Sequence, residues 1–203
     1  MIKLLLPLFI FMTSSAALAD VKINWPEGKS AVAWHTVKKM FFLKTVEPVG
    51  INTEIQAEVI TTGDIRMIRV LIPVDKFDSG EPSRDKDVAK MLKGDVQPNL
   101  EFTSLEMTTA QFTEITKGNL QAISGILKIG GQEYPVDFSI SVAGAGPDQI
   151  IDGSIITTYS HFDIKPPSVA GGLITKAKDE LNLYFHIFAK DVKGYIPGIG
   201  VRN

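Results

Sequence analysis

Apolar and polar residues alternate along much of this chain, most cleanly between positions 132 and 142. The apolar positions of this segment are Tyr134, Val136, Phe138, Ile140 and Val142. A period of two places every second side chain on the same side of an extended strand. One side is then buried and the other faces water. The segment therefore predicts a half-buried β-strand.

Runs of apolar and β-branched residues, several of them alternating, recur at intervals typical of hairpins. We expect further strands at 31–37, 51–59, 68–74, 120–129, 150–158 and 181–189, and a short one that opens at Leu100. The Gly130-Gly131 pair joins two of these segments, and a two-residue glycine link predicts a β-hairpin. About eight antiparallel strands with such spacing predict an all-β fold, either a sandwich or a closed barrel.

One segment, 83–93, has helical rather than strand spacing. Ser83 is the expected N-cap, and Gly94 is expected just beyond the C-terminus of the helix. Three apolar residues fall on one face of this helix. They are Val88, Met91 and Leu92. We expect the helix either to plug one end of the barrel or to act as a lid over the mouth of a pocket.

The N-terminus has the pattern of a cleavable signal peptide. Lys3 provides a short basic region, an unbroken apolar run covers 4–12, and Ala17-Leu18-Ala19 is the small-x-small pattern that signal peptidase recognises. The apolar run is much shorter than the roughly 20 residues that a membrane-spanning helix needs. We therefore expect residues 1–19 to be removed on export to the periplasm and residues 20–203 to form one domain.

Composition excludes several classes of partner and chemistry. The formal net charge is −2, with 21 basic and 23 acidic residues, so a nucleic-acid partner is not expected. The chain contains no cysteine, which excludes disulfides, thiol nucleophiles and thiolate metal sites. Stability must then come from packing.

No sequence motif indicates catalysis. His35, His161 and His186 are too far apart to form a spaced metal-binding motif. His186 lies in the polar phase of its strand, so we expect it to face solvent. The glycine-rich segment 194–200 lacks the strand-to-helix context of a phosphate loop and predicts a C-terminal tail. We expect a protein that is not an enzyme, with no metal and no cofactor.

Five short segments, taken in chain order, are similar to those of a known family. They are Arg84-Asp85-Lys86-Asp87-Val88 with Met91-Leu92, Gln97-Pro98-Asn99-Leu100-Glu101-Phe102-Thr103-Ser104, Gly118-Asn119-Leu120 with Gly125-Ile126-Leu127 and Gly130-Gly131, Phe162-Asp163-Ile164, and Lys178-Asp179-Glu180-Leu181. Together they resemble the YceI-like, or polyisoprenoid-binding, periplasmic proteins over nearly the whole of 20–203. The resemblance implies a lipocalin-like antiparallel barrel that holds an isoprenoid or fatty chain in its interior.

The chain departs from the family pattern at four positions. Asp87 replaces a histidine and Gln97 a tyrosine, while Lys128 and Gly130 stand where threonine and histidine are common. The chain therefore resembles a divergent member of the family. The resemblance implies the fold more directly than it implies the identity of the ligand.

The apolar phases of three strands provide the candidate lining of the barrel. The lining residues are Leu100, Phe102, Val136, Phe138, Ile140, Leu183 and Phe185. The same alternation also fits a barrel that is packed solid with its own side chains, and it is the resemblance that favours a pocket. The expected partners are an apolar lipid or isoprenoid and, transiently, a membrane surface; the oligomeric state is left open.

Three other functions fit parts of the pattern. One is a protein-interaction module with a filled barrel core. Another is an outer-membrane barrel, whose strands also alternate but with the apolar face outward. The third is a hydrolase or isomerase that acts on a lipid inside the barrel.

Overall fold

The computed structural model describes residues 21–40, 44–117, 121–169 and 175–195. The predicted signal peptide, 1–19, lies outside these ranges. Within them, no helix combines the length and apolar character needed to cross a membrane.

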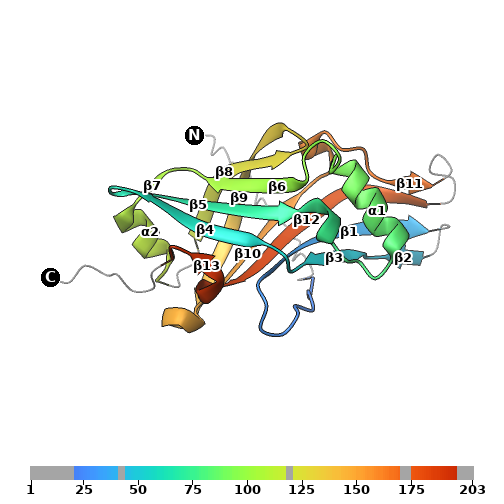
Figure 1. Cartoon of the computed structure of the whole chain (residues 1–203). Coiled ribbons are helices and arrows are strands. Elements are labelled where there is room, and N and C mark those ends of the chain that lie inside the picture. Colours follow the sequence, from blue (N-terminus) through green and yellow to red (C-terminus); the bar gives the residue numbers. More distant parts are fainter. Residues whose placement is uncertain (1–20, 41–43, 118–120, 170–174, 196–203) are drawn as a thin grey trace, which may run out of the picture.

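Thirteen strands form a single sheet in the described part of the chain. They are β1 (Ala31–Met40), β2 (Lys44–Val46), β3 (Val49–Asn52), β4 (Gln56–Thr62), β5 (Ile65–Pro73), β6 (Asn99–Ser104), β7 (Met107–Thr108), β8 (Gln121–Ile129), β9 (Gln132–Ala143), β10 (Ile150–Thr157), β11 (Ser168–Val169), β12 (Thr175–Phe188) and β13 (Val192–Lys193). Two α-helices, α1 (Pro82–Met91) and α2 (Thr109–Ile115), lie at opposite ends of the curled sheet (Figure 1). Short 3₁₀ turns occur at Val74–Lys76, Gly146–Asp148, Ser160–Phe162 and Ala189–Asp191.

The strand order is β13-β4-β5-β6-β8-β9-β10-β12-β1-β2, with β3 also paired to β1. All named pairs are antiparallel except the short parallel pair of β13 with β4. The sheet curls into a half-barrel around one apolar interior (Figure 1). The prediction of an antiparallel, barrel-like all-β fold is confirmed in these broad terms.

The predicted count of about eight strands differs from the thirteen observed. Eight strands have six or more residues, and the other five have two to four residues. Such short strands hold too few residues to establish a period of two, which is why the alternation pattern did not reveal them.

The hairpin predicted at Gly130-Gly131 is confirmed. Ile129 pairs with Gln132, and the two glycines between them have φ of 55° and 84°. Positive φ at both central residues is the geometry of a type I′ turn, which matches the twist of the flanking strands. The following strand, β9, buries every second residue from Tyr134 to Val142, as predicted.

The single strand predicted at 51–59 is wrong, because β3 ends at Asn52 and β4 begins only at Gln56. Asn52 is fully buried at this break. Its amide donates a hydrogen bond to the Pro73 carbonyl (2.7 Å), and its side-chain oxygen accepts one from the Glu54 backbone N–H (2.8 Å). A side chain that binds nearby backbone groups offers an alternative to the sheet ladder, so the chain turns here.

The caps predicted for the helix at 83–93 are also wrong. The helix α1 begins at Pro82, and Ser83 lies inside it rather than at its N-cap. Proline is favoured at the first helical position, where no backbone donor is needed. At the other end, Lys93 rather than Gly94 takes the left-handed conformation, with φ of 56°. A side chain at Gly94 would collide with Val74, since an added Cβ would lie 2.4 Å from its methyl carbon.

Candidate functional site

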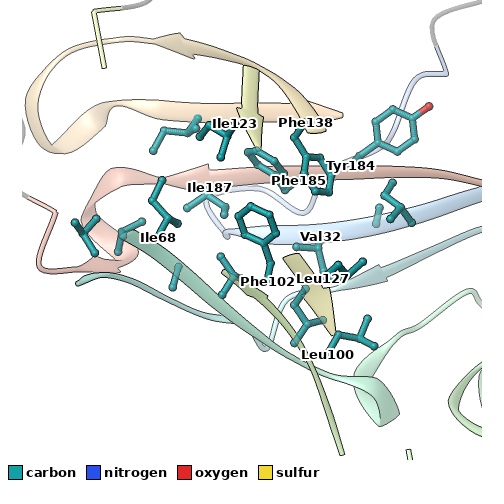
Figure 2. Close-up of a pocket in the computed structure, with 18 of the residues that line it drawn as sticks. Val32, Ile68, Leu100, Phe102, Ile123, Leu127, Phe138, Tyr184, Phe185 and Ile187 are labelled. Carbon is teal, nitrogen blue, oxygen red and sulfur yellow. The ribbon is translucent and has the colours of Figure 1, made fainter. Parts of the chain in front are cut away.

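The interior of the half-barrel contains an apolar cavity of about 140 Å³. Its walls come from strands on all sides of the curled sheet (Figure 2), and Phe112 and Ile115 of α2 also line it. An apolar cavity of about 150 Å³ in a protein core stays dry and binds small apolar molecules. This interior therefore has the size and character to accept part of an apolar ligand.

Five of the seven predicted lining residues line this cavity. They are Leu100, Phe102, Phe138, Leu183 and Phe185. The other two, Val136 and Ile140, share the buried face of β9 but lie outside the cavity wall, with 3% and 1% of their surfaces exposed. The interior thus combines a packed region with a hollow one.

Three phenylalanines from β6, β9 and β12 meet at the centre of the cavity wall (Figure 2). The ring of Phe138 lies 5.6 Å from that of Phe102, nearly perpendicular to it, and 5.5 Å from that of Phe185. Edge-to-face contacts of this kind are favourable and hold the rings in defined positions. Phe138 is the member of the set that contacts both others.

Glycines on neighbouring strands make room for two of these rings. Gly153 of β10 pairs with Phe185 of β12, and a Cβ added at Gly153 would lie 2.1 Å from the tip of the Phe185 ring. A Cβ added at Gly125 would likewise lie 2.5 Å from the Phe102 ring. Both rings therefore lie against the sheet, which leaves the middle of the cavity open.

We predict that Gly153→Ala reduces the capacity of the cavity while the protein stays folded. The new methyl group must displace the Phe185 ring, and a ring moved off the sheet enters the hollow interior. We expect the affinity for a long apolar ligand to fall at least tenfold, about 1.4 kcal/mol, in a fluorescence titration. The double variant Gly153→Ala/Phe185→Leu should recover most of that affinity. Unchanged affinity in the single variant would contradict the account of the two glycines.

A second cavity, of about 360 Å³, lies between the half-barrel and α1. The three residues predicted as a lid, Val88, Met91 and Leu92, line it and pack against the core. Five residues line both cavities. They are Trp34, Phe77, Leu100, Leu127 and Leu183. The two cavities are therefore neighbours, and α1 covers the outer one.

The outer cavity has a charged rim, unlike the inner one. Lys38, Glu81, Arg84 and Asp87 all contribute to it. Arg84 forms an ion pair with Glu81 and donates a hydrogen bond to the Ser79 carbonyl (3.3 Å). The Ser83 hydroxyl and then the Arg84 guanidinium lower the pKa of Glu81, so this rim carboxylate is ionised at neutral pH.

Two phenols lie at the cavities, Tyr159 buried and Tyr195 partly buried. Tyr159 lines the outer cavity, where burial raises the pKa of its phenol while a hydrogen bond with Thr36 opposes that shift. Tyr195 lines the inner cavity, and burial raises its pKa as well. Both side chains are therefore neutral at physiological pH.

Sequence reasoning missed the elements that close the inner cavity at the end opposite α1. Tyr195 was assigned to a tail, but its ring packs edge-on against Phe112 at 5.9 Å and its hydroxyl donates a hydrogen bond to Gln149. The rest of that tail, 196–200, lies outside the described residues. The helix α2 was also missed, although Thr108 and Gln111 form a complete capping box whose spacing is readable from the sequence.

The predicted solvent exposure of His186 is wrong. Its side chain is only 15% exposed, and Nδ1 lies 2.6 Å from a carboxylate oxygen of Asp152. Trp25 stacks on the imidazole with ring centroids 5.5 Å apart. His186 is not part of either cavity wall. Across the described ranges, no group of three or more histidine, aspartate or glutamate side chains is placed to hold a metal ion.

Comparison with known proteins agrees with this architecture. The model of the YceI-like domain matches residues 26–189. No match was found among curated proteins. BcnA of Burkholderia cenocepacia is 24% identical, with a TM-score of 0.57 over 77% of this chain and 94% of that one.

Two further solved structures share the fold at lower identity. A polyisoprenoid binding domain from Saccharophagus degradans, implicated in plant cell wall breakdown, is 12% identical, with a TM-score of 0.55 over 78% of this chain and 95% of that one. The YCEI protein of Campylobacter jejuni is 14% identical, with a TM-score of 0.53 over 84% of this chain and 96% of that one.

Proposed function

Because the chain belongs to the YceI-like domain family, we propose that it is a lipid-binding protein that holds one long apolar chain, isoprenoid or fatty, inside its half-barrel. The observation that carries this proposal is the apolar cavity beneath Phe102, Phe138 and Phe185, which adjoins a second cavity with a charged rim. The polyisoprenoid binding by the Saccharophagus degradans domain, which has the same fold, supports the choice of ligand class.

Burial of a hydrocarbon chain alone supplies enough free energy for such a function. Each buried methylene contributes roughly 0.8 kcal/mol, so a chain of about 20 carbons would gain on the order of 16 kcal/mol before the costs of binding. Those costs amount to several kcal/mol. An apolar wall discriminates poorly between chains that differ by one methylene. The site should therefore select for apolar length more than for a single compound.

The difference between the two cavities orients the ligand. The inner cavity is closed by α2 and Tyr195 and has almost no polar groups, so it suits the apolar end of a chain. The outer cavity has charged residues at its rim, so it suits the polar end. We expect the ligand to enter tail first past α1.

We further propose that the protein acts in the periplasm as a carrier or store of this lipid and not as an enzyme. The signal-peptide pattern at 1–19 supports export. The inner wall around Phe138 supports binding without chemistry, because its side chains are almost all hydrocarbon and include no carboxylate, imidazole or amine. Transient contact with a membrane would allow loading and release.

The outer surface of β9 favours this reading over an outer-membrane barrel. Glu133, Asp137, Ser139 and Ser141 are exposed there, while the apolar residues of the strand point into the interior. A lipid-facing barrel would have the opposite arrangement, with apolar side chains outward.

Titration with cis-parinaric acid, an 18-carbon fatty acid that fluoresces in apolar surroundings, tests the proposal. We expect saturable binding of one molecule per protein and its displacement by the C20 alcohol geranylgeraniol. The Gly153→Ala variant provides a matched control, since it changes the inner wall by one methyl group. The proposal would be overturned if the fluorescence rose linearly with added ligand and did not saturate. It would also be overturned if the wild type and Gly153→Ala gave identical titration curves.

A further inference from the structure

The five side chains that line both cavities mark the place where the cavities meet. We call this set, Trp34, Phe77, Leu100, Leu127 and Leu183, the waist. Four of its members, all except Leu183, are between 4% and 8% exposed. Because these side chains leave so little open surface, the waist is a constriction between the inner and the outer cavity.

The waist brings together two separate parts of the curled sheet. Leu100 and Leu127 come from the neighbouring strands β6 and β8, while Trp34 and Leu183 come from the neighbouring strands β1 and β12. Strands β9 and β10 separate the two pairs in the order of the sheet. The curl of the sheet therefore sets one pair across the interior from the other (Figure 1). A chain that runs from the outer cavity into the inner one passes between them.

Trp34 has the largest side chain of the waist, and Gly50 of β3 determines where its indole lies. Gly50 and Leu183 are the residues paired with Trp34 on its two neighbouring strands. Paired residues of antiparallel strands present their side chains on the same face of a sheet. A Cβ added at Gly50 would lie only 2.3–2.5 Å from three atoms of the indole. The indole thus occupies the space over Gly50 that any other side chain would fill.

We propose that Trp34, seated over Gly50, sets the width of the waist and so selects lipids whose apolar end is a slim, ring-free chain. This inference rests on the proposed function and narrows its ligand class. In the orientation proposed above, the apolar end of the lipid reaches the waist first. A slim end passes into the inner cavity, whereas an end that carries a ring is held back in the outer one.

Shape is the property by which this part of the interior can select a ligand. The other members of the waist, Phe77 and the three leucines, have hydrocarbon side chains that cannot form hydrogen bonds. A close-packed interior yields little to a group that is too wide, and overpacking is costly. A lipid that stops at the waist also leaves methylenes outside the inner cavity, and each buried methylene is worth roughly fourfold in affinity.

A competition between two C20 alcohols on the wild type and on Trp34→Phe tests this inference. Geranylgeraniol has a slim apolar end, whereas all-trans-retinol has a six-membered ring there and the same hydroxyl at the other end. The protein is incubated with an equimolar mixture, and the bound alcohols are extracted and quantified by mass spectrometry. We expect the wild type to prefer geranylgeraniol at least about tenfold. Trp34→Phe, which removes one of the two fused rings, should reduce that preference to less than about threefold.

Gly50→Ala should have the opposite effect, because its methyl group pushes the indole away from β3, toward Leu183 and the passage. Geranylgeraniol should then bind at least about tenfold more weakly, while the C10 alcohol geraniol, short enough for the outer cavity, should change by less than about threefold. Displacement of cis-parinaric acid measures both affinities. The double variant Gly50→Ala/Trp34→Phe should recover most of the geranylgeraniol affinity, because the smaller ring leaves room for the methyl group.

The outcomes separate this inference from the proposed function. Equal binding of retinol and geranylgeraniol by the wild type would overturn the selection by Trp34 and leave the lipid-binding function standing. Equal weakening of both linear alcohols in Gly50→Ala, or no recovery in the double variant, would also overturn the inference. If Gly50→Ala does not fold, the competition on the wild type and Trp34→Phe decides the question alone. If the wild type binds none of these alcohols, the proposed function fails as well.

Discussion

Phe138→Trp should abolish lipid binding while the protein keeps its fold. Phe138 contacts both Phe102 and Phe185 at the centre of the cavity wall, so a larger ring at this position occupies space that the ligand needs. We expect ligand affinity to fall by more than tenfold. In a solid core the same change would be overpacking, at a cost of about 1–3 kcal/mol. Because the core of this protein is hollow at Phe138, we expect the free energy of unfolding to fall by less than about 1 kcal/mol.

Two measurements on the same samples decide this prediction. Bound lipid is quantified by titration, and the free energy of unfolding is measured by urea denaturation. Ser139→Ala is the matched control, because Ser139 is the next residue of β9 and is exposed on its outer face. A Phe138→Trp protein that binds lipid normally and is merely less stable would contradict the assignment of this wall.

Ile140→Ala should have the opposite profile, with a large loss of stability and little effect on the binding site. Ile140 is two residues further along β9, is only 1% exposed and lies outside the wall of either cavity. Truncation of a packed isoleucine typically costs about 2–5 kcal/mol. The variant should unfold at lower urea concentration, while the lipid affinity of its folded fraction stays within about twofold of the wild type.

The pair of variants on one strand therefore separates the packed part of the interior from the hollow part. If Ile140→Ala left stability unchanged but reduced lipid affinity, the cavity would extend past Ile140, and the boundary drawn here would be wrong. Val136→Ala offers a second test of the packed region, because Val136 is likewise buried outside the cavity wall.

The sequence predicted most reliably the strands that are half-buried. In β9, one face is in the core and the other in water, so the period of two is visible in the residue types themselves. The Gly130-Gly131 hairpin was equally readable, because positive φ at two successive residues has a strong glycine preference. Both features depend on local physics, which a single sequence records.

The place of Trp34 in the cavity walls could not be predicted from the sequence, because its strand is buried on both faces. In β1, residues of both faces are buried, including Ala33 and His35 beside Trp34, so burial leaves no alternation to read. Its place at the junction of two cavities depends on Gly50 of β3, a strand of four residues that the pattern merged with β4. The place of such a residue depends on contacts between strands, and the periodicity along one strand does not reveal those contacts.

The helix α1 illustrates a mixed outcome. Its apolar stripe was predicted correctly, and Val88, Met91 and Leu92 line the outer cavity. Its ends were predicted wrongly. At the N-terminal end, Asp85 accepts hydrogen bonds from the backbone N–H and the hydroxyl of Ser79 (3.0 and 2.5 Å), which lies outside the helix. Tertiary contacts of this kind override the capping preference of a single residue such as Ser83.

Native mass spectrometry of the protein, purified without detergent from the cells that produce it, tests the central claim most directly. The account predicts a species with one lipid per chain, whose extracted lipid has a long apolar tail that ends in a polar group. It also predicts that Phe138→Trp, purified in the same way, carries no such lipid. If the wild-type protein is folded yet consistently free of lipid, and stays free after incubation with geranylgeraniol, the interior is not a lipid-binding site.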